Sequence, residues 1–130
     1  MLLTEDISVE HYQIRAYDAV SVTINETLYT SSVIVSPSKL ISDWNPKSLE
    51  ELKSEHFQIV LSLNPEVVIF GTGKKFIFPV QEKLRLLFQK RIGIESMDTG
   101  AACRTYAALM SEGRKIVAAL IINNNSWNNA

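Results

Sequence analysis

Residues 97–114, which read MDTGAACRTYAALMSEGR, are the most informative stretch of this chain. An Asp-Thr-Gly turn opens the stretch, and an alanine-rich segment with apolar residues at helical spacing follows at once. Gly113 suits the end of that helix, because glycine readily adopts the left-handed backbone that stops a helix. The stretch therefore predicts a turn followed by a helix over residues 99–110.

Short apolar strands flank this turn and helix on both sides. Residues 66–70 form a continuous apolar run, EVVIF, that ends at Gly71, and residues 116–122 form another. Runs of this kind are typical of strands that are covered on both faces of a sheet. A further strand is expected over residues 92–96, after a helix that begins at Pro79. A core-facing stripe on that helix should consist of Val80, Leu84, Leu87 and Phe88.

The first half of the chain has a different pattern. Apolar and polar residues alternate in three segments, which predicts an antiparallel β meander over residues 12–16, 21–24 and 28–35. Ser48 and Glu51 match a capping box, which predicts a helix or broken helix over residues 49–63. The expected fold class is therefore α/β, with an N-terminal β meander followed by β-α-β-α-β. Three layers should surround a central mixed β-sheet.

Length and composition restrict the broad class of protein. The chain has 130 residues, so we expect one α/β domain over residues 1–122 and a flexible asparagine-rich tail over residues 123–130. The 13 basic and 14 acidic residues give a net charge of −1 without a basic block. This balance argues against a nucleic-acid partner and against anionic membranes. With one cysteine, no secretory signal and no run of ~18 apolar residues, we expect a cytoplasmic protein without membrane insertion.

A glycine turn, Gly71-Thr72-Gly73, follows the first buried strand. Open α/β sheets bind ligands outside the carboxyl ends of their strands, and glycines let backbone amides approach an anion closely. The match to a nucleotide-binding motif is incomplete, because Phe76 stands where a dinucleotide fingerprint has its third glycine. The turn is therefore either a small-anion site or a tight strand exit.

A second turn, Asp98-Thr99-Gly100, opens the predicted helix over residues 99–110. The triplet matches the aspartic-protease signature, but such proteases are nearly all β, whereas a helical pattern follows here. Asp98 also suits a helix N-cap, where a carboxylate accepts hydrogen bonds from backbone amides. We expect Asp98 to cap the helix, with or without lining a pocket.

Cys103 and Arg104 lie one turn into the same helix. The spacing of Cys103, Tyr106, Ala107 and Met110 describes a core face, which predicts a buried, unreactive cysteine. Arg104 points away from that face, so it is either solvated or directed at a carboxylate or phosphate. Two scattered histidines and one cysteine match no metal-ligand spacing, so we expect neither a metal nor another cofactor.

Three ordered motifs carry a resemblance to a known family. They are Gly71-Thr72-Gly73 after an apolar strand, MDTGAACRTY at residues 97–106, and Glu112-Gly113-Arg114 before Val117-Ala118-Ala119-Leu120. Together they resemble the domain of unknown function 498 family, which includes an assembly factor of mitochondrial respiratory complex I. One departure is visible, since Ala107 stands where members of the family usually carry asparagine.

The resemblance implies a three-layer α/β fold with a mixed sheet and no established enzymatic activity. It also implies protein partners, in the biogenesis of a membrane complex. Because the residues themselves form no complete catalytic set, we favour a non-catalytic protein-interaction module similar to an assembly factor over an enzyme.

The alternative is a small-anion binding protein or an enzyme, with a crevice between the two turns. If the strands before the turns are parallel neighbours, both turns meet at one edge of the sheet. The ligand or partner contacts would then be Gly71, Thr72, Gly73, Asp98, Thr99, Gly100 and Arg104.

Overall fold

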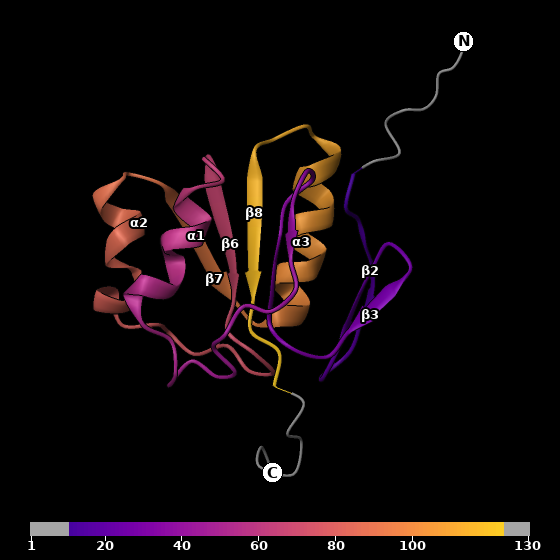
Figure 1. Ribbon diagram of the computed structural model, residues 1–130, viewed down its shortest axis with the longest axis horizontal. Coiled ribbons are helices and arrows are strands. Elements are labelled where there is room, and N and C mark those ends of the chain that lie inside the picture. Colours follow the sequence, from indigo (N-terminus) through magenta and orange to yellow (C-terminus); the bar gives the residue numbers. More distant parts are fainter. Residues whose placement is uncertain (1–10, 124–130) are drawn as a thin grey trace.

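The computed structural model describes residues 11–123, and this part of the chain forms two β-sheets and three α-helices (Figure 1). The larger sheet has the strand order β5-β4-β8-β6-β7. Its strands are Leu40–Ile41 (β5), Val33–Val35 (β4), Ile116–Leu120 (β8), Val67–Gly71 (β6) and Gly93–Met97 (β7). β6 runs parallel to both β7 and β8, whereas β4 runs antiparallel to β5 and β8. The predicted α/β class with a mixed sheet is confirmed.

The smaller sheet is the expected antiparallel meander, in the order β1-β2-β3. Its strands are Ile14–Tyr17 (β1), Val22–Ile24 (β2) and Thr27–Tyr29 (β3). The prediction of one strand over residues 28–35 is wrong, because the chain leaves β3 at Tyr29 and enters the other sheet as β4. The buried Ser32 hydroxyl fixes this passage, since it donates to the Pro46 carbonyl at 2.6 Å and accepts from the Ile122 amide at 2.9 Å.

The helices lie on opposite faces of the five-stranded sheet (Figure 1). Helix α3, Thr99–Ser111, packs against β6 and β8 on one face, and the meander lies beyond it through contacts with β1. Helices α1, Gln58–Leu61, and α2, Arg85–Gln89, lie on the other face. Each of these two short helices continues a 3-10 turn, Ser54–Phe57 (η2) before α1 and Gln81–Leu84 (η3) before α2.

Alternation along the central strands divides the core into two clusters. Ile69 of β6 and Ala118 of β8 pack under α3, together with Tyr106. Their neighbours Phe70 and Ala119 face α1 and α2. Since both faces are covered, every residue of β8 is buried, which accounts for the continuous apolar run in the sequence.

The predicted helix or broken helix over residues 49–63 is helical only over residues 54–61, as η2 followed by α1, and it is wrong before Lys53. The Glu51 amide does bond to the Ser48 hydroxyl at 3.3 Å, but this contact belongs to an isolated turn. The chain is extended at Lys53, with φ −125° and ψ 157°, so a helix cannot pass through it. Helical structure then begins afresh at η2, where His56 Nδ1 accepts a hydrogen bond from the Lys53 amide at 2.9 Å.

The predicted helix from Pro79 is shorter than expected, and half of its core stripe is wrong. Val80 is extended, with ψ 145°, so helical structure begins at Gln81, two residues after the predicted start at Pro79. Leu84 and Leu87 are buried as expected, but Val80 and Phe88 are exposed. A 3-10 turn has three residues per turn instead of 3.6, so η3 rotates the side chains away from the positions they would have in one continuous α-helix. The four residues therefore do not form a single buried stripe.

In α3, Cys103 and Tyr106 are buried as predicted, but Ala107 is exposed and does not belong to the core face. The proposed domain and tail boundaries extend into residues 1–10 and 124–130, which lie outside the described residues. Within residues 11–123, no helix is long and apolar enough to cross a membrane.

Candidate functional site

The two turns singled out in the sequence meet at the carboxyl edge of the five-stranded sheet. β6 and β7 are parallel neighbours in register, with Gly71 opposite Met97, so both turns leave the sheet at the same side (Figure 1). The Thr72 amide donates to the Met97 carbonyl at 2.8 Å, and the Thr99 amide donates to the Gly73 carbonyl at 2.9 Å. The structure therefore brings the turns together by direct backbone hydrogen bonds.

The side chain of Thr99 joins three segments at this edge. Its hydroxyl accepts a hydrogen bond from the Gly73 amide at 2.9 Å and donates to the Ile121 carbonyl at 2.8 Å. The approach requires glycine at position 71, because a Cβ there would lie 2.8 Å from the Thr99 hydroxyl and 2.9 Å from its Cα. Since the Gly73 and Thr99 amides both donate within the protein, this turn does not direct them at an anion.

Asp98 caps α3, as the sequence predicts. Its carboxylate accepts a hydrogen bond from the Ala101 amide at 2.8 Å, and its extended backbone precedes the first helical residue. Gly100, in the first turn of the helix, faces the meander, where a Cβ would lie 3.1 Å from the ring of Tyr17. The first turn of α3 is therefore covered by β1.

Arg104 continues this contact with the meander. Its guanidinium donates a hydrogen bond to the Tyr17 hydroxyl and lies 5.8 Å from the centre of the Tyr17 ring. The hydrogen bond and the charge interaction with Tyr17 raise the pKa of Arg104 above its usual value. Arg104 therefore helps to hold β1 on α3, and its role as a ligand or partner contact stays a prediction.

Cys103 has the properties of a core residue rather than a nucleophile. Its side chain is buried between α3 and the sheet, and burial raises the pKa of its thiol to about 12. The thiol is therefore protonated at neutral pH, which suppresses its nucleophilic reactivity. Burial also raises the pKa of Tyr106, whose hydroxyl donates to the Tyr12 carbonyl at 2.8 Å.

A cavity of about 480 Å³ opens at the same edge, and we call it the edge cavity. Of the seven residues proposed from sequence as contacts, Thr72 and Gly73 line it, whereas the others do not: Gly71, Asp98, Thr99, Gly100 and Arg104. Three lysines, Lys47, Lys74 and Lys75, are among its lining residues, with Glu50 as the one acidic residue. The edge cavity is thus mainly cationic, and it lies beside the glycine turn rather than between the two turns.

Residues 74–80, KKFIFPV, leave the edge cavity as an exposed segment that we call the apolar loop. Phe78 is 82% exposed, and Phe76, Ile77 and Val80 are also exposed. The rings of Phe76 and Phe78 pack edge to face, with centroids 4.8 Å apart. Exposed apolar side chains in such a group are typical of an interaction surface.

Sequence reasoning missed the apolar loop because it assigned Val80 to a core-facing helix and treated Phe76 only as a missing glycine. A signal was present, since Phe76, Ile77 and Phe78 follow two lysines and precede a proline, without the alternation of a half-buried strand. Lys47 is far from the apolar loop in the sequence, so only the fold shows that it lies at the same cavity as Lys74 and Lys75.

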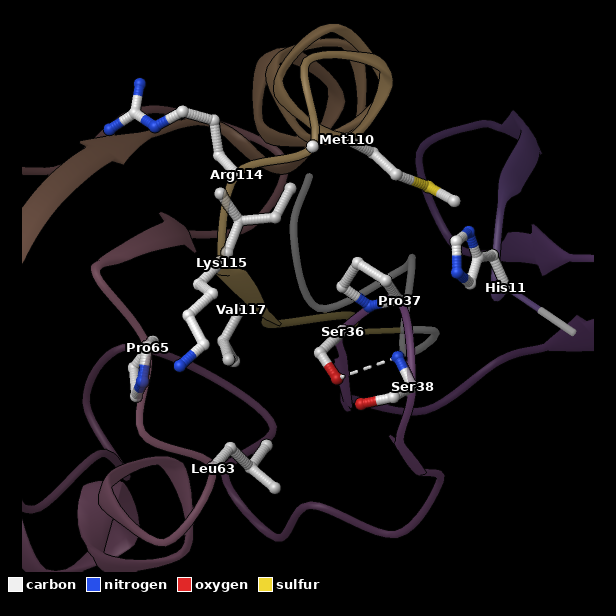
Figure 2. A pocket seen from close by; sticks show the side chains of 12 residues that line it. His11, Ser36, Pro37, Ser38, Leu63, Pro65, Met110, Arg114, Lys115 and Val117 are labelled. Carbon is white, nitrogen blue, oxygen red and sulfur yellow. Dashed lines mark hydrogen bonds between the residues drawn. The ribbon is translucent and has the colours of Figure 1, made fainter. Parts of the chain in front are cut away.

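A second cavity, of about 260 Å³, lies at the opposite edge of the sheet, near the start of β8 (Figure 2). Leu63, Pro65 and Val117 supply apolar walls, and His11 and Lys115 lie at its sides. Arg114 also lines it, but pairs with Glu66 at 3.5 Å. Across residues 11–123, no group of three or more histidine, cysteine, aspartate or glutamate side chains is arranged to hold a metal ion.

Comparison with known proteins now identifies the family. Residues 14–121 match the model of the family described as a protein of unknown function, DUF498/DUF598. The chain belongs to this family. The resemblance inferred from the three sequence motifs is therefore confirmed, and the match covers both sheets and all the helices described above.

Similar proteins support the same fold and include an assembly factor. A rat protein, NADH dehydrogenase [ubiquinone] 1 alpha subcomplex assembly factor 3, is 34% identical over 110 residues, which are 83% of this chain and 59% of the rat protein. The 13 kDa major membrane protein of Francisella tularensis is 26% identical over 95 residues, or 72% of this chain and 76% of that protein. A Xanthomonas campestris structure superposes with a TM-score of 0.82 at 36% identity, covering 96% of this chain and 95% of its own.

Proposed function

We propose that this protein is a non-catalytic interaction module that assists the assembly of a membrane protein complex. The rat relative is named an assembly factor, and this chain spans about three fifths of its length, 59%. The shared region includes the domain in which the apolar loop lies. We therefore propose for this chain only the class of activity, which is binding to other molecules during assembly. The identity of the complex and of the partner is not carried over from the rat protein.

The exposed apolar loop is the observation that carries the proposal. A folded monomer gains stability by burying large apolar side chains, yet Phe76, Ile77, Phe78 and Val80 all remain exposed. The base of the loop is well anchored, because the buried Thr72 hydroxyl donates to the Lys75 carbonyl at 2.8 Å and accepts from the Ile77 amide at 3.3 Å. An anchored loop with outward apolar side chains is suited to contact another surface.

The groups with reactive potential are committed to structure, which favours binding over catalysis. Asp98 caps a helix, the Thr99 hydroxyl holds two backbone groups, and the thiol of Cys103 is buried with a raised pKa. A nucleophile needs a general base within hydrogen-bond reach, and none of these three groups contacts a histidine in the described residues.

Genetic complementation in the native host tests the proposal. The gene is deleted, and membrane complexes are resolved on native gels and quantified by mass spectrometry. We expect at least one complex to fall in abundance or to accumulate as a subcomplex, and wild-type protein to restore it. Phe76→Ser/Phe78→Ser should fail to restore it, whereas the control Phe88→Ser, at an exposed position on α2, should succeed. Unchanged membrane complexes after deletion would contradict the proposal.

A further inference from the structure

We infer that the carboxyl edge of the five-stranded sheet docks on a bilayer surface that carries anionic headgroups. The apolar loop would insert shallowly, while the amines of Lys47, Lys74 and Lys75 contact headgroup phosphates. The inference rests on the proposed function, which places the protein at a membrane complex, and it names the surface that the loop contacts.

The apolar part of this surface is a compact projection. Phe76 and Phe78 pack on each other rather than into the core, and Ile77 lies between them in the chain. Val80 extends the exposed apolar set by one further side chain on the far side of Pro79. Aromatic and aliphatic side chains of this size favour the boundary between headgroups and acyl chains.

The cationic part lies at the base of the same projection. Lys74 and Lys75 line the edge cavity beside Thr72 and Gly73, and Lys47 approaches it from the segment before η2. In the part of the chain that the structure describes, no ion pair or hydrogen bond engages these three amines. Each such amine near an anionic leaflet strengthens binding by about fivefold.

The separation of the two parts favours a bilayer over a groove on a protein partner. The three lysines line the cavity and Ile77 also reaches it, whereas the exposed side chains of Phe76, Phe78 and Val80 are not among its lining residues. This order, cations first and apolar side chains beyond, matches the order of phosphates and acyl chains in a leaflet. A partner groove would instead be expected to meet hydrogen-bonding side chains around the apolar centre, and the loop carries none beyond its lysines.

The net charge of −1 does not oppose this docking. Charges on the far side of the molecule are screened over about 8 Å at physiological ionic strength, so the local lysines dominate at the edge. Glu50 is the one acidic residue that lines the edge cavity. Net charge and the lack of a basic block in the sequence do not report this cluster, because only the fold brings Lys47 beside Lys74 and Lys75.

Flotation of the purified full-length chain with vesicles tests the inference. The probes are vesicles of phosphatidylcholine alone and an equimolar mixture of phosphatidylcholine and phosphatidylglycerol. We expect flotation with the anionic vesicles and little with the neutral ones. Lys74→Gln/Lys75→Gln should weaken binding by on the order of tenfold or more. Lys39→Gln/Lys90→Gln removes the same charge from exposed sites outside the edge cavity and should bind like wild type.

The apolar contribution is tested in the same assay. Phe76→Ser/Phe78→Ser should abolish flotation, and Phe88→Ser should not. The Phe78→Trp and Phe88→Trp variants are then compared by tryptophan fluorescence in vesicles that contain brominated lipid. We expect the lipid to quench the tryptophan at position 78 and not the one at position 88. Such quenching reports insertion of the loop rather than electrostatic contact alone. All these variants change exposed side chains, and circular dichroism is the check that each variant folds.

Two results would overturn the inference. One is a wild-type chain that fails to float with anionic vesicles, and the other is binding that survives Phe76→Ser/Phe78→Ser. The wild-type chain could fail to bind vesicles while Phe76→Ser/Phe78→Ser still fails to restore a membrane complex in the host. That pair of results would show that the loop contacts a protein instead of a bilayer. In that case the proposed function stands without the bilayer contact.

Discussion

The hydroxyl of Thr99 accepts a hydrogen bond from the amide of Gly73 at 2.9 Å, across the gap between the two turns at the carboxyl edge. The same hydroxyl donates to the Ile121 carbonyl, so one buried side chain ties together the exits of β6, β7 and β8. An edge fixed in this way can hold the adjoining apolar loop in a defined position, because the segments at its base have little freedom to move.

Replacement of Thr99 by valine should destabilise the fold by about 2–4 kcal/mol, since two buried backbone groups lose their partner at about 1–3 kcal/mol each. Valine keeps the shape of threonine, so the loss reports the hydrogen bonds rather than a cavity. Thr105→Val is the matched control, because within residues 11–123 the Thr105 hydroxyl makes a single hydrogen bond, to the Met97 sulfur at 3.3 Å. Urea unfolding measures both variants, and equal midpoints would contradict the assigned role of Thr99.

Gly71→Ala should destabilise the protein by about 1–3 kcal/mol, the usual cost of overpacking. The added Cβ would lie 2.9 Å from the Cα of Thr99, which is backbone and cannot move aside without shifting α3. Gly93→Ala, at the other end of the parallel strands, is the control, because its nearest contact would be 3.6 Å. A thermal midpoint for Gly71→Ala as high as that of Gly93→Ala would mean that the edge is more adaptable than the geometry indicates.

Loss of the Asp98 carboxylate should lower stability by about 1 kcal/mol, because the Ala101 amide loses its cap. Asp98→Asn should retain most of the stability, since asparagine is also a good N-cap residue. The comparison of Asp98→Ala with Asp98→Asn by chemical unfolding therefore isolates capping from charge. If Asp98→Asn were as unstable as Asp98→Ala, the negative charge itself would be the important property of this residue.

Helix α3 was predictable from sequence because its local signals agree. An N-cap at Asp98, small residues on the sheet-facing side and a glycine at the end all favour the same helix, and tertiary packing reinforces it. The meeting of the two turns was predictable as well, because it follows from the parallel order of neighbouring strands. The hydrogen bonds of the Thr99 hydroxyl to the Gly73 amide and the Ile121 carbonyl were not predictable, because residue spacing does not specify where a side chain points.

The errors occur where a local signal competes with packing. Ser48 and Glu51 form the turn that their capping pattern indicates, but extended Lys53 lets Leu52 and Phe57 enter the core from separate segments. The edge cavity was not predictable, because Lys47 and Lys75 come from segments that only the fold brings together.

The unfolding free energy should fall as the pH rises above 9, because the folded state keeps a proton on Cys103 that the unfolded state loses. The ordinary thiol pKa of 9.0 is raised to about 12 in the fold, so the loss extends from about pH 9 to pH 12. One such group gives a slope of about 1.4 kcal/mol per pH unit. Cys103→Ala should remove this slope between pH 9 and 10, before Tyr106 contributes. Identical slopes in the variant and the wild type would contradict a buried, protonated thiol.

Thr72→Val should release the apolar loop while leaving the sheet intact. The Thr72 hydroxyl donates to the Lys75 carbonyl and accepts from the Ile77 amide, so valine removes both restraints on the loop. We expect faster hydrogen exchange at Ile77 and faster tryptic cleavage after Lys74 and Lys75, with unchanged exchange in β6. Thr105→Val again serves as the control. Because an ordered loop loses less conformational entropy when it docks, Thr72→Val should also weaken vesicle binding without altering any side chain that contacts lipid. Unchanged cleavage and unchanged binding would show that the loop is held by contacts other than Thr72.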